Sequence, residues 1–325
     1  MSDMEFASDV VALSILVPVK DEEESVGRLV DEVVAALDGS DVAVGRHWEL
    51  IFIDDGSTDR TWEEIRKASA RESRVRALRF RRNFGKSTAL AAGLAAARGR
   101  LIATLDGDLQ DDPAEIPGMI ARLDEADLVA GFKADRKDPI SKRLPSKIFN
   151  AVTSLVTGLK LRDHNCGLKV ARREVFEAVP LYGEMHRYFA AIAHAQGFKV
   201  VEQSVNHRPR LFGRSKFGLE RYARGGLDLI TVLGLTRYTN RPAHLFGGVG
   251  LVVGVLGMAI LAYLGAIWLF TDQGIGTRPL LTLGVLMVLV GVQLISLGVL
   301  AEMMVRREVV REDPLSRVVE MIDLD

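Results

Sequence analysis

The spacing of apolar residues divides the chain into a first part with short apolar runs and a last part with two long ones. In the first part the short runs alternate with segments of helical spacing, and we expect each run to be a strand. These runs cover residues 11–19, 48–54, 75–80, 100–106 and 127–132. Continuous apolar strands separated by helices predict an α/β fold with a mostly parallel sheet covered on both faces.

Three segments between these runs carry apolar residues on one helical face. Their apolar positions are Val26, Leu29, Val30, Val33, Val34 and Leu37 in the first, Trp62, Ile65 and Ala68 in the second, and Leu90, Leu94 and Ala97 in the third. Helices with one apolar stripe pack against a sheet. Ligands of parallel sheets bind at the carboxyl ends of the strands, so we expect the functional site at that edge.

The two long apolar runs cover residues 245–270 and 280–301, and neither contains a charged residue. Each is long enough for a helix to cross a hydrocarbon core of about 30 Å. We therefore predict a transmembrane hairpin with the short polar link 271–278. The alternative is a pair of buried helices in a soluble core, where uncharged runs of this length are rare.

Basic residues flank the hairpin on its outer sides. They are Arg237 and Arg241 before the first run and Arg306, Arg307 and Arg311 after the second, whereas the link holds only Arg278. The positive-inside rule predicts an integral protein of the cytoplasmic membrane with both termini in the cytoplasm. Residues 214–241 mix basic and apolar side chains, and we expect interfacial helices there.

Glycines recur along both long runs. They are Gly247, Gly250, Gly254 and Gly257 in the first and Gly284, Gly291 and Gly298 in the second. Small residues at such spacing let helix backbones approach closely in lipid. The seam serves packing either within the hairpin or between protomers of a homo-oligomer, and the sequence leaves both open.

Composition excludes some classes of protein. A formal net charge of −1 argues against a globally basic nucleic-acid binder, so we expect no nucleic-acid partner. A single cysteine, Cys166, permits no intramolecular disulfide and fits a reducing compartment. The first ten residues carry three acids and no basic segment, so we expect no signal peptide at this end.

Acidic residues follow three of the predicted strands. They are Asp21 and Glu22 after the first, Asp54 and Asp55 after the second, and Asp106 and Asp108 after the fourth. Each pair alone is typical of a turn or helix cap, and Ser57, Thr58 and Asp59 are candidate caps of the next helix. Three pairs at one sheet edge favour a binding site instead.

The segment "TLDGDLQDDP" (residues 104–113) contains the most promising metal ligands. Asp106 and Asp108 offer hard oxygen ligands to Mg²⁺ or Mn²⁺, an ion that normally bridges to substrate phosphates. Two other motifs are rejected. "GKST" (85–88) lacks the first glycine of a phosphate loop, because Phe80 stands there. His164 and Cys166 lack further spaced ligands, so we expect them to be structural.

Five segments in this order resemble family 2 glycosyltransferases of the GT-A fold. They are "ILVPVKDEEES", "IFIDDGSTDRT", "RRNFGKSTALAAGL", "TLDGDLQDDP" and "NHRPRLFGRSKFG", and together they span roughly residues 14–218. More narrowly, they resemble the polyprenyl-phosphate glycosyltransferases, the group that contains dolichol-phosphate mannose synthase. The two long apolar runs match membrane-anchored bacterial members of that group.

The resemblance assigns roles to individual positions. It implies that the nucleotide contacts Pro18, Asp21, Glu22 and Asp54, with Asp55 nearby, and that a metal binds Asp106 and Asp108, with Gln110 close to it. It implies phosphate contacts from Lys133 and Arg143. It also implies a loop that binds the acceptor phosphate through Ser215 and Lys216, assisted by Arg208, Arg210 and Arg214. Lys20, Asp21, Lys133 and Arg214 depart from the commoner pattern of the group, which leaves the nucleotide and the sugar open.

The implied function is inverting transfer of a sugar from a UDP-hexose or GDP-mannose to undecaprenyl or dolichyl phosphate at the cytoplasmic membrane face. Residues 1–213 are then a GT-A catalytic domain, 214–243 juxtamembrane helices, 244–304 the hairpin and 305–325 a cytoplasmic tail. One alternative is a polysaccharide synthase, although no tryptophan fits its Gln-x-x-Arg-Trp motif. The other is a non-enzymatic, membrane-anchored nucleotide-binding scaffold.

Overall fold

The computed structural model describes residues 11–40, 47–133, 150, 153–154, 157–206, 208, 242–271, 274, 276 and 278–311. The chain divides into two compact units, Met1–Thr236 and Arg237–Asp325. The boundary falls within the predicted juxtamembrane segment 214–243. Residues 214–241 of that segment, and the tail from 312 onward, lie outside the described residues.

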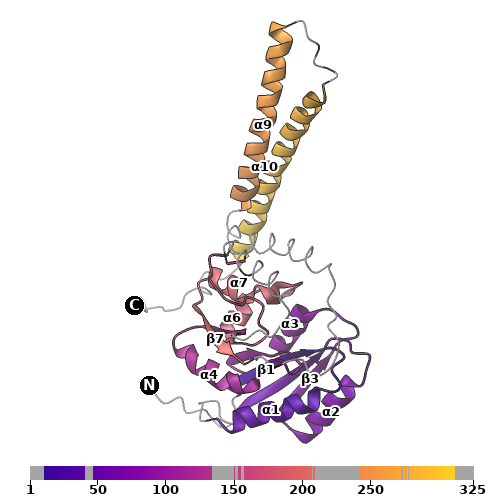
Figure 1. Cartoon of the computed structure of the whole chain (residues 1–325), viewed down its shortest axis with the longest axis vertical. Coiled ribbons are helices and arrows are strands. Elements are labelled where there is room, and N and C mark those ends of the chain that lie inside the picture. Colours follow the sequence, from indigo (N-terminus) through magenta and orange to yellow (C-terminus); the bar gives the residue numbers. More distant parts are fainter. Residues whose placement is uncertain are drawn as a thin grey trace. The chain divides into compact units, whose positions relative to one another are not determined.

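A seven-stranded sheet forms the centre of the first unit (Figure 1). Its strands, in spatial order, are β3 (Val75–Arg79), β2 (Trp48–Asp54), β1 (Leu13–Val19), β4 (Leu101–Thr104), β6 (Lys169–Arg172), β5 (Leu128–Lys133) and β7 (Val200–Val205). Neighbouring strands are parallel except that β6 runs antiparallel to both β4 and β5. The five predicted strands and the mostly parallel sheet are confirmed, and β6 and β7 are additions to them.

Helices cover both faces of this sheet. The three predicted helices are α1 (Val26–Asp38), α2 (Thr61–Arg71) and α3 (Lys86–Ala96), and shorter helices follow as α4 (Ile116–Ala121), α6 (Arg173–Ala178) and α7 (Phe189–Ala195). Single turns of 3-10 helix are η1 (Pro113–Glu115), η2 (Arg122–Asp124) and η3 (Met185–Arg187).

Alternate residues of β1 explain the two layers. Leu13, Ile15 and Val17 belong to a core cluster shared with α1, α2 and α4, whereas Leu16 belongs to a second cluster shared with α3, α6 and α7. All four side chains are fully buried. Successive strand side chains point to opposite faces, so a strand that is apolar at both sets of positions must be covered on both faces.

Two long antiparallel helices, α9 (Pro242–Phe270) and α10 (Pro279–Arg311), belong to the second unit (Figure 1). Leu245–Phe270 and Pro279–Met304 are long and apolar enough to cross a membrane, with mean hydropathies of 2.4 and 2.5. Large apolar side chains such as Leu251, Trp268 and Phe270 are exposed. The core helices of a soluble protein would bury such residues, and the exposure is typical of helices that face lipid.

The glycine seam packs within the hairpin. A methyl group added to Gly250 would lie 2.7 Å from the carbonyl oxygen of Gly291, and one added to Gly257 would lie 2.9 Å from that of Gly284. Only hydrogen fits at these positions, so the two backbones approach closely. Gly247 has open space around the same added group. Association between copies through these helices stays a prediction.

Candidate active site

The acidic residues meet at the carboxyl edge of the sheet, because β1, β2 and β4 are parallel neighbours. Asp54 ends β2 and is in register with Val19 at the end of β1. The segment after β4 packs closely on β1, since a Cβ on Gly107 would lie only 2.6 Å from the side chain of Val19. Glycine at position 107 therefore allows Asp106 and Asp108 to reach the other acids.

The acids after β1 and β2 hold the turns that follow these strands. Oδ1 of Asp21 accepts a hydrogen bond from the amide of Thr58 (2.9 Å), and Oδ1 of Asp54 accepts one from the amide of Ser57 (2.8 Å). The amide of Glu22 donates to Oγ1 of Thr61 at 2.7 Å. Asp21 takes a left-handed conformation with φ of 52°. These contacts fix the shapes of the two loops.

Of the predicted cap residues, Asp59 accepts a hydrogen bond from the amide of Thr61 (2.9 Å) at the start of α2. Ser57 faces the other loop instead, where its Oγ accepts from the amide of Asp21 at 2.9 Å. The residues that stabilise the turns after β1 and β2 therefore also lie at the edge where the site is expected.

Asp55 positions the loop that leads into α3. Its two carboxylate oxygens accept hydrogen bonds from the amides of Phe84 (2.7 Å) and Gly85 (3.0 Å). Gly85 has φ of 91°, a conformation that glycine adopts without strain, and α3 begins at the next residue, Lys86. Asp55 thus fixes the place from which the Lys86 side chain extends.

Lys86 forms an ion pair with Asp106 across this edge. Burial alone would raise the pKa of Asp106, but the charge and hydrogen bond of Lys86, with smaller contributions from Lys133 and Lys169, lower it to about 2. Gly167 lies against the same carboxylate, since an added Cβ would fall 2.6 Å from it. Asp106 is therefore an ionised carboxylate in a confined position.

Asp111 is the least satisfied acid in the cluster. It is 1% exposed, and neither of its carboxylate oxygens accepts a hydrogen bond in the part of the chain that the structure describes. Among the described residues, the Lys133 ammonium lies 3.8 Å from its Oδ1. Burial, then the charge of Asp106, raises the pKa of Asp111 to about 6. Asp108 is also buried, at 9% exposure.

This arrangement fits a divalent cation that substrate phosphates help to hold. Asp106, Asp108 and Asp111 concentrate negative charge, and Asp111 has orphaned oxygens that a cation would satisfy. Among the described residues no group of three or more His, Cys, Asp or Glu side chains is placed so that it could hold a metal ion, so the protein would supply at most two of these ligands. Two carboxylates completed by phosphate and water are the usual Mg²⁺ environment.

Gln110 and Arg208 lie together beside this cluster. The amide of Arg208 donates to the carbonyl oxygen of Gln110 at 2.9 Å. The Arg208 guanidinium contacts Glu32 of α1 (2.6 Å) and Asp112 (2.7 Å). Both carboxylates hold Arg208 at this edge and balance its positive charge.

The remaining predicted site residues divide into two groups. Pro18 lies in β1, and Lys133 ends β5 beside Asp111. Residues outside the described part of the chain are Arg143, Arg210, Arg214, Ser215 and Lys216. The predicted roles of this second group stay predictions.

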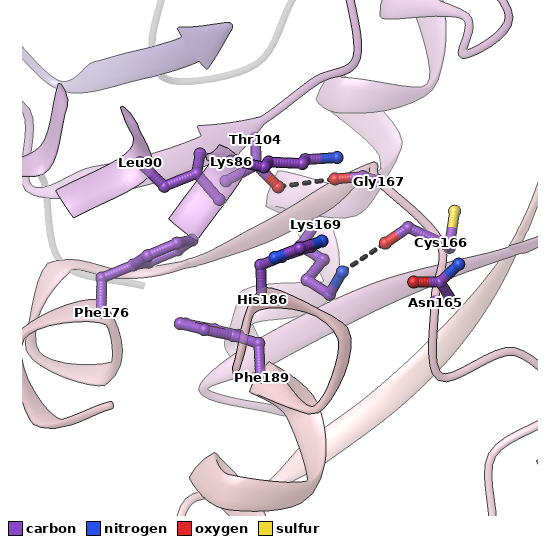
Figure 2. A pocket seen from close by; sticks show the side chains of 10 residues that line it. All are labelled: Lys86, Leu90, Thr104, Asn165, Cys166, Gly167, Lys169, Phe176, His186 and Phe189. Atoms are coloured by element: carbon purple, nitrogen blue, oxygen red, sulfur yellow. Dashed lines mark hydrogen bonds between the residues drawn. The ribbon is translucent and has the colours of Figure 1, made fainter. Parts of the chain in front are cut away.

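The structure adds three residues that the sequence did not suggest: Lys86, Lys169 and His186. They line a cavity next to Asp106, together with Leu90, Thr104, Asn165, Cys166, Gly167, Phe176 and Phe189 (Figure 2). In "GKST" a lysine directly follows a glycine at the start of a helix, and this is the sequence signal for the place of Lys86. Lys169 is a buried charge at the start of the short strand β6, "KVAR", and the sequence gives no clear signal for its burial.

His164 and Cys166 have contacts of a structural kind. Nε2 of His164 lies 3.0 Å from Oγ of Ser154, and burial lowers the pKa of His164 to about 4. Cys166 is 1% exposed, and its carbonyl oxygen accepts a hydrogen bond from Lys169. Both residues belong to the segment that supports the cavity wall.

Curated proteins of similar sequence align with most of this chain. A dodecaprenyl-phosphate galacturonate synthase of Rhizobium johnstonii is 44% identical over 90% of this chain and 88% of its own length. An undecaprenyl-phosphate 4-deoxy-4-formamido-L-arabinose transferase of Edwardsiella ictaluri is 32% identical over 89% and 87% of the two chains.

Solved structures share the fold at lower identity. Glucosyl-3-phosphoglycerate synthase of Mycobacterium tuberculosis superposes with a TM-score of 0.53 at 20% identity, covering 69% of this chain and 79% of that one. A complex of that enzyme with Mn²⁺, UDP and glucosyl-3-phosphoglycerate superposes with a TM-score of 0.52 at 19% identity. The predicted GT-A fold is confirmed.

Residues 14–179 match the model of glycosyl transferase family 2. With this match and the similarity over most of its length, the chain belongs to glycosyl transferase family 2, a family of enzymes.

Proposed function

We propose that the protein transfers a sugar from a nucleotide-diphosphate sugar to a polyprenyl phosphate, with inversion at the anomeric carbon. The observation that carries this proposal is the occurrence, in one chain, of the acidic edge around Asp106 and two helices long enough to cross a membrane. A lipid phosphate is a substrate that explains both. The two curated relatives are named for products or acceptors of this class.

The donor lies along the carboxyl edge of the sheet. Pro18, Asp21, Glu22 and Asp54 line the base and ribose, and Asp55 holds the neighbouring loop. Asp106 and Asp108, with Gln110 nearby, hold Mg²⁺ or Mn²⁺ on the donor diphosphate. When bound, the ion neutralises charge on the leaving nucleoside diphosphate. Lys133 lies beside the same phosphates, opposite Asp111.

The acceptor requires little activation by the protein. A phosphate monoester is already an anion near neutral pH, so its oxygen attacks the anomeric carbon without a strongly basic side chain. The new bond joins the phosphate oxygen to the sugar, while the bond to the diphosphate breaks and the diphosphate keeps the electron pair. The chain's cations reduce repulsion between the two anionic substrates. They are Arg143, Arg208, Arg210, Arg214 and Lys216, with Ser215 in the same loop.

The membrane orientation is part of this proposal. Catalytic domain, amino terminus and carboxyl terminus are cytoplasmic, and residues 214–243 lie along the headgroup surface. A cysteine replacing Gln273 in the link is expected to react with an impermeant thiol reagent in intact cells. Native Cys166 is buried and contributes no background. Labelling that requires cell lysis would reverse the orientation.

A panel of labelled nucleotide sugars tests the reaction itself. Purified protein in detergent receives each donor, polyprenyl phosphate and Mg²⁺ or Mn²⁺, and the lipid phase is extracted and counted. Label is expected in the lipid with at least one donor and with an inverted anomeric linkage by NMR. If label reaches only water-soluble or polymeric products, the acceptor is a different one and the proposal fails.

A further inference from the structure

One face of α10 carries a seven-residue repeat of apolar side chains with a polar centre. The repeat consists of Leu286, Gln293 and Leu300 at one position and Leu289, Ser296 and Met303 at the other. Each apolar member is 55 or 56% exposed. Apolar residues at these two positions of a seven-residue repeat form the seam along which two helices pack, and a single polar residue in that seam fixes how the helices align.

This face points away from α9, the other helix of the hairpin (Figure 1). Gly291 packs against α9, since a Cβ added to it would lie 2.6 Å from the carbonyl oxygen of Gly250. Gln293 follows Gly291 by two residues, which turn a helix by about 200°. The hairpin therefore leaves the repeat uncovered.

Gln293 is a polar side chain at the middle of a helix that is long and apolar enough to cross a membrane. It is exposed and lies near the centre of the 26-residue span Pro279–Met304. Its amide has two donors and an acceptor, and none of them is hydrogen-bonded to a residue that the structure describes. Ser296 differs, because its hydroxyl donates to the carbonyl oxygen of Val292 at 2.9 Å.

A glutamine that faces hydrocarbon lacks the hydrogen bonds that water would give it, and this is costly. Polar side chains of membrane helices are normally satisfied by contact with another helix. Lipid tails offer neither a donor nor an acceptor. The partner of this face therefore presents a hydrogen-bonding group at the depth of Gln293.

A second copy of the chain meets this requirement. Copies of one protein have the same orientation in the membrane, so their Gln293 side chains lie at the same depth. A two-fold axis along the membrane normal brings the same face of both copies together. The amide both donates and accepts, so two glutamines satisfy each other reciprocally.

We infer that two copies of this chain associate in the membrane through this face of α10, with their Gln293 amides hydrogen-bonded to each other. The contact lies opposite the glycine seam, so each hairpin keeps its own packing. The inference goes beyond the proposed function, because it requires only that the two helices cross the membrane. Activity in sugar transfer neither supports nor opposes it.

Disulfide cross-linking of the full-length protein in membranes tests the face. Leu289→Cys places a thiol within the repeat, and Val252→Cys places one on α9, where Val252 is 59% exposed. The two positions have the same depth, because each lies two residues from the contact between Gly250 and Gly291. Native Cys166 is buried and gives no background.

Oxidation with copper phenanthroline is expected to convert Leu289→Cys to a covalent dimer and to leave Val252→Cys monomeric. Leu300→Cys, on the same face, should behave as Leu289→Cys does. Equal cross-linking of both helices, or no dimer from either α10 variant, overturns the inference. Release of the protein from membranes by carbonate washing also overturns it, because the face would then meet water.

Substitution of Gln293 tests the hydrogen bond. Gln293→Leu is expected to weaken association by about 3- to 30-fold, the range found for polar contacts between membrane helices, whereas Gln293→Asn keeps an amide and should weaken it less. Energy transfer between labelled copies, diluted with lipid in liposomes, measures the dissociation constant. Association of Gln293→Leu as strong as that of wild type overturns the pairing of the glutamines.

Discussion

Asp54 and Asp55 after β2, and Asp106 and Asp111 after β4, lie in similar acidic segments but have different hydrogen-bond and ion-pair partners. Asp55 accepts two backbone hydrogen bonds at 2.7 and 3.0 Å, and Asp54 accepts one at 2.8 Å. Asp111 is equally buried but accepts none in the described part of the chain, and Asp106 pairs with a lysine. The first pair stabilises loops, and the second cluster holds negative charge that lysines balance in part, through Lys86 at Asp106 and Lys133 near Asp111.

Along one sheet edge, some carboxylates therefore stabilise the fold and others are available to bind a cation. Carboxylates that accept backbone hydrogen bonds contribute to the free energy of unfolding. Carboxylates crowded together without donors cost stability, and a cation ligand recovers that cost. Asp55 also supports the chemistry indirectly, because it fixes the loop before Lys86. Substitutions in the two clusters should therefore have opposite effects on stability and unequal effects on activity.

The largest effect is expected from Asp108→Asn. The amide keeps the size of the side chain but is a poor ligand for a hard cation, so transfer should fall by about 10³-fold or more. Lipid labelling measures transfer, and Mn²⁺ binding by electron paramagnetic resonance should weaken in parallel. Asp31→Asn, at an acid that is 64% exposed on α1, is the matched control and should transfer normally. Undiminished Mn²⁺ binding in Asp108→Asn would remove this residue from the metal site.

Asp55→Ala is expected to lower the free energy of unfolding by about 1 to 3 kcal/mol, because the amides of Phe84 and Gly85 lose their acceptor. Chemical denaturation monitored by circular dichroism measures the change. Transfer should also fall, since Lys86 loses its fixed starting point, but less than in Asp108→Asn. A variant as stable as wild type would mean that water replaces the carboxylate without cost.

Asp111→Asn is expected to stabilise the metal-free protein. A carboxyl group whose pKa is raised to about 6 in the folded state destabilises that state as pH rises from about 4 to 6, and the penalty stays constant above pH 6. Removing the charge should add about 1 to 3 kcal/mol at pH 7.5 and almost nothing at pH 4. Denaturation in EDTA at both pH values measures this. Saturating Mg²⁺ and nucleotide should shrink the gain, and a loss of stability at pH 7.5 without metal would contradict it.

Sequence reasoning located the fold because the fold depends on local patterns. The runs that became β1 and β2 are largely apolar, and the helices α1 and α2 have a regular apolar face. Strands β6 and β7 were missed for physical reasons. β6 has four residues and includes the charged Lys169, and the residues of β7 are largely half-buried, so neither gives a strong periodic signal.

The sequence predicted at which edge of the sheet the site lies, but it did not predict the ion pairs and hydrogen bonds within the site. The positions of Asp54, Asp55, Asp106 and Asp108 after two strands of a parallel sheet predicted their convergence, and β2 and β4 are the two neighbours of β1. Nothing in the sequence distinguishes Asp55, which accepts backbone hydrogen bonds, from Asp111, which accepts none from the residues that the structure describes. That distinction depends on which amides the tertiary fold brings within about 3 Å. The pairing of Lys86 with Asp106 likewise joins residues from α3 and the segment after β4.

Lys86→Met is expected to change metal binding less than Asp108→Asn does, and in the opposite direction. Lys86 competes with a cation for Asp106, so its removal should tighten Mn²⁺ binding several-fold at pH 7.5 in the absence of donor. Transfer should fall, because the positive charge of Lys86 lies at the acidic edge where the donor diphosphate is proposed to bind. Lys67→Met, at an exposed lysine of α2, is the control for general loss of positive charge. Weaker Mn²⁺ binding in Lys86→Met would show that Lys86 supports the metal and does not compete with it.

The smallest effect is expected at Cys166, beside the cluster after β4. Burial, and then the negative charge of Asp111, raises the pKa of its thiol to about 12, so almost no thiolate exists at pH 7.5. Wild-type protein should therefore stay unlabelled by a maleimide over hours and become labelled once it is denatured, as mass spectrometry would record. Removing the Asp111 charge relieves only the second cause, so Asp111→Asn should also remain unlabelled. Rapid labelling of folded wild type would mean that water enters beneath Asp111, and the contrast between its unsatisfied carboxylate and that of Asp55 would then be lost.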